Sequence, residues 1–169
     1  MQLDIREEAP GDVASIHALN AAAFPTDAEA RLVDALRASG ALTLSLVAID
    51  DGVVVGHIGF SPVTVEAAGH LVEGIGLAPM AVAPAHQRQG IGGRLVVEGL
   101  RRLRAQGHRF CVVLGHVAYY PRHGFVPGRV HGLRWEHGHD AAFFVQALAP
   151  GGLDGLAGVV RYRAEFDAV

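Results

Sequence analysis

The chain has no lysine, because all 14 of its basic residues are arginine. This absence excludes lysine Schiff-base and lysine general-base chemistry, and also any self-modification on lysine. Cysteine is nearly absent as well. The one thiol, Cys111, lies in the apolar run 110–114 and has no second cysteine with which to form a disulfide. We therefore interpret Cys111 as a small buried hydrophobic residue.

No apolar run is long enough to cross a bilayer. The stretch 41–49 has the length of a strand and ends at Asp50 and Asp51, well short of the roughly 20 residues that a membrane-spanning helix needs. The N-terminus has no basic region followed by an apolar run, so we expect no secretory signal and a cytoplasmic location. The net charge of −3 lacks the basic excess that general nucleic-acid binding requires.

Apolar residues, by contrast, are abundant. Half of the 169 residues are hydrophobic, 18% are charged, and the mean hydropathy is +0.28, which together exclude intrinsic disorder. The length suits one domain with a sizeable core and is too short for two ordinary domains. We therefore expect residues 1–169 to form a single domain.

Helix and strand signals are mixed along the chain. The expected elements are helices after Asp12 and after Thr26 or Asp27, strands 42–49, 53–60 and 72–82, a helix 92–104, a strand 110–114, a helical turn 118–123, and strands 142–148 and 158–162. Asp51-Gly52 predicts a hairpin turn between the first two strands, and Ala68-Gly69 predicts another. Pro79 predicts a bulge or a lost neighbour in the third strand. The mixture predicts an α/β (α+β) fold.

The segment that opens the long helix has the composition of an anion-binding loop. It is Gln87-Arg88-Gln89-Gly90-Ile91-Gly92, and it directly follows an expected strand and turn. Amides in the first turn of a helix lack intrahelical partners and carry partial positive charge. Gly90 and Gly92 allow a bulky anion to approach the main chain, and Arg88 and Arg94 add charge. The sequence therefore predicts that this loop binds a pyrophosphate.

Two other kinds of phosphate loop fit less well. The P-loop needs a Gly-Lys-Ser/Thr ending, and the chain has no lysine. The dinucleotide-binding pattern needs three glycines and an acidic residue at the end of a second strand, where this chain has Leu114-Gly115-His116. A plain strand-to-helix turn without a ligand is the remaining alternative.

Several consecutive segments resemble the GCN5-related N-acetyltransferase (GNAT) superfamily. They are Met80-Ala81-Val82-Ala83-Pro84, the loop 87–92, the strand 111–114, and Ala118-Tyr119-Tyr120-Pro121-Arg122-His123-Gly124-Phe125. The run 114–121 is similar to a bacterial subgroup of small acetyltransferases. The resemblance implies a mixed central sheet of about six to seven strands, splayed between strands 4 and 5 and flanked by about four helices.

The resemblance also implies acetyl-CoA as the cosubstrate. Met80, Ala81 and Val82 would bond to the pantetheine arm and the acetyl carbonyl. The pyrophosphate would be held by Gln87, Arg88, Gln89, Gly90, Ile91, Gly92, Gly93 and Arg94. An amide near Met80 would polarise the thioester.

For catalysis, the resemblance aligns Tyr120 with the tyrosine that protonates the departing thiolate; core packing is the alternative for this side chain and for Tyr119. His116 stands where many relatives carry Asn, and it would bond the pantetheine or relay a proton. No general base matches clearly. Some relatives carry Glu where this sequence has Gly76, so Glu73, offset by three residues, is a candidate base. A water chain or His57 is the alternative.

The ten histidines, notably His131, His137 and His139, raise the question of a metal site. The chain has no HExxH motif and no set of spaced Cys and His residues that could bind a metal tetrahedrally. We therefore expect a polar loop and no metal. Trp135, with Arg129 and Arg134, is expected to line the acceptor side.

These expectations combine into one hypothesis for function. It is an acetyl-CoA-dependent N-acetyltransferase, in which a primary amine of a small molecule or peptide attacks the thioester directly in a ternary complex. The alternative is a non-catalytic acyl-CoA-binding sensor or interaction module. No nucleic-acid or membrane partner is expected, and a homodimer is possible because dimers are common among relatives.

Overall fold

The computed structural model describes all 169 residues. The α-helices are α1 (Val13–Ala23), α2 (Ala28–Ala38) and α3 (Ile91–Ala105). The strands are β1 (Leu3–Glu7), β2 (Leu44–Asp50), β3 (Val53–Ala67), β4 (His70–Val82), β5 (Phe110–Leu114), β6 (Val126–Pro127), β7 (Leu133–Trp135), β8 (Phe143–Ala147) and β9 (Gly158–Arg161). Their hydrogen-bonded order is β1-β2-β3-β4-β5-β8-β6, and β9 pairs with β3 and β7. The expected mixed α/β class is confirmed, because β4–β5 and β7–β9 are parallel whereas β1–β2, β2–β3 and β5–β8 are antiparallel.

The chain forms two compact units. The first comprises Met1–Ser61, Ala78–Gly99 and Ala164–Val169, and the second comprises Pro62–Leu77 and Leu100–Arg163. The strands β3 and β4 and the helix α3 each contribute residues to both units.

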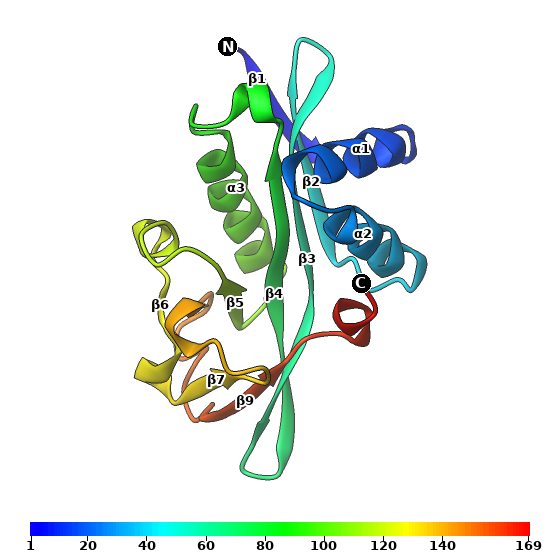
Figure 1. Ribbon diagram of the computed structural model, residues 1–169. Helices are drawn as coiled ribbons and strands as arrows, with labels where there is room; N and C mark the ends of the chain where they lie inside the picture. Colours follow the sequence, from blue (N-terminus) through cyan, green and yellow to red (C-terminus); the bar gives the residue numbers. More distant parts are fainter. The chain divides into compact units, whose positions relative to one another are not determined.

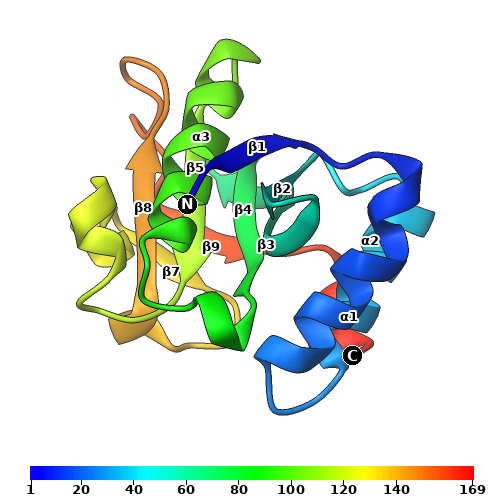
Figure 2. The same cartoon turned by 90° about the horizontal axis from the view of Figure 1, so that it is seen from above.

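In the first unit, helices cover both faces of the sheet. Gly56 of β3 faces α3, since a Cβ atom there would lie 2.9 Å from Ile91 Cγ2. The next residue, His57, points to the opposite face, where its Nδ1 lies 3.2 Å from Asn20 Nδ2 of α1. Figures 1 and 2 both show α1 and α2 lying side by side, with the C-terminal turn next to them. The strand β3 is therefore buried on both faces at residues 56 and 57.

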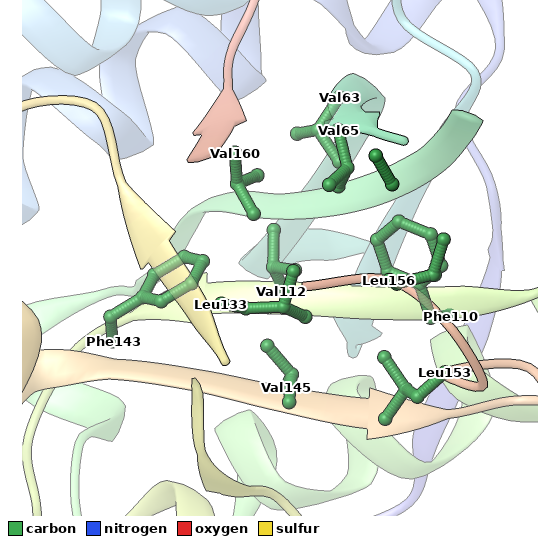
Figure 3. Close-up of a cluster of buried hydrophobic side chains, with 11 residues drawn as sticks. Val63, Val65, Phe110, Val112, Leu133, Phe143, Val145, Leu153, Leu156 and Val160 are labelled. Carbon is green, nitrogen blue, oxygen red and sulfur yellow. The ribbon is translucent and has the colours of Figure 1, made fainter. Parts of the chain in front are cut away.

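In the second unit, one hydrophobic cluster is built from five strands. Figure 3 shows Val112 of β5, Leu133 of β7 and Val145 of β8 pointing toward one another. Val63 of β3 and Val160 of β9 complete the same cluster. Burial of aliphatic and aromatic side chains from strands far apart in sequence is what stabilises this unit.

Most expected boundaries agree with the structure to within two residues. The main exception is β3, which continues past Phe60 to Ala67. Its later residues pair with β9, through Thr64↔Arg161 and Val65↔Val160. The turn of the first hairpin is as predicted, with φ of 49° at Asp51 and 77° at Gly52. The parallel register of β4 with β5 runs from Ile75↔Cys111 to Leu77↔Val113, and β4 then continues through Pro79 to Val82.

The counts of elements differ from those expected. The sheet has nine strands rather than about six or seven. The expected elements included neither β1 nor the two very short strands β6 and β7, which give no periodic signal in the sequence. There are three α-helices rather than four, and the segment 120–123 is a 3₁₀ turn that ends at Gly124 with φ of 88°. None of the helices combines the length and apolar character that a bilayer crossing requires.

Candidate functional site

The loop between β4 and α3 is fixed to the sheet at its first residues. The amide of Ala83 donates to the carbonyl of Val55 on β3 at 2.8 Å, and the amide of His86 donates back to Ala83 at 2.8 Å. Gln87 turns its side chain onto the preceding strand, where its Nε2 donates to the Val82 carbonyl at 3.0 Å. The loop therefore leaves the sheet in a defined direction.

The start of α3 presents backbone amides to an exposed surface. The first i→i−4 bond of the helix runs from the amide of Arg94 to the carbonyl of Gly90 at 3.1 Å, so the amides of Ile91, Gly92 and Gly93 precede the intrahelical ladder. Gly90 adopts φ of 82°, and a Cβ atom on it would meet nothing within 4 Å. A bulky anion can therefore approach these amides without a side chain in the way.

The two arginines of the loop are placed differently. Arg88 is exposed and adopts a left-handed backbone with φ of 61°. Arg94 is exposed on the first turn of α3, where its Nη2 donates to the Leu3 carbonyl of β1 at 3.4 Å. Both expected positive charges lie at the start of α3, but only Arg94 is held by a backbone contact to a neighbouring strand.

The residues expected to bond the pantetheine end β4 in the same unit. Ala81 is buried, whereas Met80 and Val82 are half-buried. The structure therefore places Met80 to Val82 directly before the loop, as one continuous stretch of the first unit.

Tyr120 is buried in the second unit, in the 3₁₀ turn that follows β5. Its side chain is only 7% exposed, and burial raises the pKa of its phenol, with Tyr119 and Cys111 adding to the effect. The ring packs edge-on against Tyr119 at 5.0 Å and Phe125 at 5.7 Å between centroids. A Cβ atom at Gly115 would overlap the Tyr120 ring, so a glycine is required there. The phenol is thus held in a fixed place and stays protonated.

The other two candidate catalytic residues are exposed. His116 starts the turn that carries Tyr120, because its carbonyl accepts the amides of Tyr119 at 3.1 Å and Tyr120 at 3.4 Å. Glu73 lies near the hairpin end of β4. Seven residues separate it from Met80, which is roughly 23 Å along an extended strand.

His57, the alternative base, is buried in the first unit with both ring nitrogens occupied. Asn20 Nδ2 lies 3.2 Å from its Nδ1, and Ser45 Oγ lies 2.9 Å from its Nε2. Asn20 Nδ2 also donates to the Ile16 carbonyl at 3.0 Å, which fixes the amide so that it donates to Nδ1 and leaves the proton of the imidazole on Nε2. Burial lowers the pKa of His57 to about 3, with a smaller effect from the charge of Arg37. His57 is therefore a neutral structural residue that is unsuited to accept a proton.

Tyr162 was not identified from the sequence. It follows β9, and its ring lies over Gly76 of β4, where a Cβ atom would be 3.0 Å from Tyr162 Cε2 and 2.9 Å from Val63 Cγ1. Burial raises the pKa of its phenol, and the side chains of Cys111 and Tyr120 are close enough to raise it further. The pairing of β9 with β3 and with β7 brings Tyr162 to this position, and no local pattern encodes that pairing.

The histidine-rich segment forms an aromatic cluster. The Trp135 ring lies 4.8 Å from that of His137 and 5.5 Å from that of His139. No group of three or more His, Cys, Asp or Glu side chains in the chain could hold a metal ion. Cys111 is a buried free thiol, and burial raises its pKa, so the thiol stays protonated. This agrees with its interpretation as a small buried hydrophobic residue.

Comparisons with known proteins agree with this geometry. A model of the acetyltransferase (GNAT) domain matches residues 4–128. The uncharacterized N-acetyltransferase YhbS of Escherichia coli (strain K12) is 44% identical over 166 residues, which cover 96% of this chain and 98% of YhbS.

Two solved structures are similar over almost the whole chain. The crystal structure of YhbS from Escherichia coli in complex with CoA has a TM-score of 0.94 at 43% identity, covering 99% of this chain and 93% of that one. A GNAT family acetyltransferase from Brucella melitensis in complex with acetyl-CoA has a TM-score of 0.82 at 43% identity, covering 98% and 99%. These matches confirm the resemblance that the motifs indicated: the chain belongs to the GNAT family of N-acetyltransferases.

Proposed function

We propose that this chain is an acetyl-CoA-dependent N-acetyltransferase that transfers an acetyl group to a primary amine of a small molecule or peptide, with residues 1–169 acting as one domain. The observation that carries the proposal is the exposed start of α3, where amides ahead of the helical ladder meet open space at Gly90. Its two similar solved relatives hold CoA and acetyl-CoA, which supports the same ligand here.

The residues present fit a diphosphate. The amides of Gly90 to Gly93 supply donors, Arg88 and Arg94 supply charge, and the partial positive charge of the helix start favours an anion. In this proposal, Gln87 to Arg94 bind the pyrophosphate, and the backbone of Met80 to Val82 bonds to the pantetheine arm. Bound acetyl-CoA supplies an activated thioester.

Tyr120 is proposed as the general acid. Because burial keeps its phenol protonated, it can donate the proton of Oη to the thiolate as the carbon–sulfur bond breaks and the amine nitrogen bonds to the acetyl carbon. The extra proton of that nitrogen passes to solvent water. His116, which is exposed at the start of the same turn, is proposed to relay the replacement proton from solvent. Glu73 has weaker support because it is exposed near the far end of β4, and the proposal does not use it.

A thiol-release assay tests the proposal. Acetyl-CoA is incubated with a panel of primary amines, with wild-type protein and the Tyr120→Phe variant, while calorimetry measures the affinity for CoA. We expect an acetylated amine and release of CoA thiol, both strongly reduced in the variant. Tight CoA binding without any acetylated amine across the panel would instead establish a non-catalytic acyl-CoA-binding module.

A further inference from the structure

The chain offers no buried group that can take the proton of an acceptor amine. Only four buried side chains titrate, namely Asp12, His57, Cys111 and Tyr120. The Asp12 carboxylate accepts from Arg6 at 2.7 Å and from the amide of Ala9 at 2.7 Å, and His57 is held neutral by its two partners. The thiol of Cys111 and the phenol of Tyr120 already carry their protons.

Partly buried and exposed groups do not change this picture. The five carboxylate residues of the second unit, which also contains Tyr120, are all exposed: Glu66, Glu73, Glu136, Asp140 and Asp154. Three half-buried acidic or histidine side chains keep one buried atom without a hydrogen-bond partner: Glu29 Oε2, His86 Nδ1 and His123 Nε2. Burial, together with the charge of Arg122, lowers the pKa of His123. Glu29, His86 and His123 are therefore the side chains that a direct test has to examine.

Two half-buried aromatic side chains pack against the hydrophobic cluster of the second unit, which also contains Tyr120. We call Trp135 and Tyr162, whose ring centroids lie 6.5 Å apart, the aromatic wall. Tyr162 lies over Gly76 of β4, and the charges of Cys111 and Tyr120 add to the effect of burial in raising the pKa of its phenol.

The other end of the wall is flanked by titratable side chains of the β7–β8 loop. The rings of His137 and His139 pack on Trp135, and Glu136 Oε1 lies 3.7 Å from His137 Nε2. An aromatic wall in the unit that carries the proposed acid suits an apolar or aromatic group on the acceptor.

The charge of the second unit restricts the acceptor further. This unit carries nine arginines against five carboxylates, which leaves a net charge of +4 with histidine neutral. The first unit carries five arginines against twelve carboxylates, a net charge of −7, so the positive charge is confined to the second unit and disfavours polycations, including polyamines, only at that unit.

We propose that the acceptor is an α-amine with an aromatic or large apolar side chain, as in an amino-acid amide or the first residue of a peptide, and that it binds as the neutral amine against the aromatic wall. This inference rests on the proposed function. An α-amine has a pKa of about 7.7–8.0 and a lysine side chain about 10.4, so near pH 7.5 the neutral fraction of an α-amine is roughly 200-fold larger or more. An enzyme without a base depends directly on that fraction, because only the neutral nitrogen attacks.

Matched acceptors test the inference with the wild-type protein. Phenylalaninamide and phenethylamine share the ring but differ in amine basicity, alaninamide keeps the α-amine without the ring, and spermidine is a polycation. At pH 7.5 we expect kcat/KM for phenylalaninamide to exceed that for phenethylamine about 100-fold and that for alaninamide about 10-fold, with spermidine lowest. The midpoint of kcat/KM against pH should follow the pKa of each acceptor amine.

Two variants and one spectroscopic signal sharpen the test. Glu29→Gln, His86→Gln and His123→Gln should leave the midpoints unchanged. Because Trp135 is the single tryptophan, its fluorescence should change saturably when phenylalaninamide is added to the CoA-bound protein and stay constant with alaninamide. Trp135→Leu should raise KM for phenylalaninamide about 10-fold and leave KM for alaninamide unchanged, which also shows that the variant is folded.

The possible failures are distinguishable. One midpoint shared by all acceptors, a shift of the midpoint in Glu29→Gln, His86→Gln or His123→Gln, or a preference for spermidine would overturn the inference while leaving the acetyltransferase proposal intact. Binding of CoA without acetylation of any amine would overturn both.

Discussion

The loop at the start of α3 and the region around Tyr120 and Tyr162 are built in opposite ways. The loop is one continuous, exposed segment whose proposed binding groups are backbone amides. The tyrosine region brings together side chains from the turn after β5 and the end of β9, of which Tyr120 is buried and Tyr162 half-buried. Backbone amides are still present after most substitutions, but a bulky side chain can prevent a ligand from reaching them. A side-chain site, by contrast, depends on single atoms such as the oxygen of a phenol. The two regions should therefore fail in different ways.

The largest effect is expected from removal of one oxygen in the tyrosine region. Tyr120→Phe should lower kcat about 1000-fold, because general acid catalysis contributes about 10²–10⁴-fold, while CoA affinity stays within about twofold. Steady-state kinetics and calorimetry measure the two quantities. The matched control, Tyr119→Phe, should change kcat less than about threefold. An unchanged kcat in Tyr120→Phe would remove the phenol from the chemistry.

The loop should respond to bulk instead. Gly90→Trp places a large side chain where an anion would approach, at a backbone φ of 82°, and should weaken CoA binding at least about 100-fold. Gly107→Trp is the control, since Gly107 has φ of 85° and nothing within 4 Å of its Cβ position, at the other end of α3. Calorimetry would show equal losses in both variants if backbone strain rather than the ligand site were responsible.

The buried His57 predicts a pH dependence of folding in the first unit. Its pKa is about 3 in the folded chain and about 6.5 when unfolded, so its neutral form is favoured by folding. The stability is complete above pH 6.5 and is lost as the pH falls toward 3. Between pH 7 and pH 5 the loss is about 2 kcal/mol.

Urea unfolding of wild type and His57→Gln at both pH values isolates this contribution, since other groups titrate equally in the two proteins. Equal losses of unfolding free energy in both proteins would show that His57 is not held neutral in the folded chain.

The smallest effects compare one substitution in the loop at the start of α3 and in the turn between β3 and β4. Ala68 and Arg88 adopt left-handed φ of 50° and 61°. Replacement of either by glycine relieves backbone strain of about 1–2 kcal/mol in the folded state. Glycine also raises the conformational entropy of the unfolded chain, which offsets part of this gain, so each substitution should stabilise the fold by about 0.5 kcal/mol. Only Arg88→Gly should also weaken CoA binding, by about tenfold. Thermal unfolding measures the change in stability, and calorimetry measures the affinity for CoA. Equal weakening of CoA binding in Ala68→Gly and Arg88→Gly would contradict a role of Arg88 in binding.

Sequence reasoning succeeded where the determining interactions are local. The turns at Asp51-Gly52 and Gly124, the stripe of α3 and the glycine turn at Gly90 that precedes it each depend on neighbours a few residues away. The family motifs between residues 80 and 125 are equally local, and the family assignment that they indicated is confirmed over the whole chain.

The rest depended on pairing between distant segments. The extension of β3 is made by β9, nearly 100 residues later, and the same pairing brings Tyr162 over Gly76. The partners of a histidine on a strand cannot be seen in sequence, so His57 is an alternative base at that stage. Its neutral state follows from Asn20, 37 residues away, and Ser45, 12 residues away.

The most direct measurement is a titration of isotope-labelled protein with CoA, followed through the backbone amide resonances. We predict that the largest changes fall on Gly90, Ile91, Gly92 and Gly93, the amides at the start of α3. Saturable binding of CoA that leaves these four resonances in place would contradict the claim that this loop holds the diphosphate.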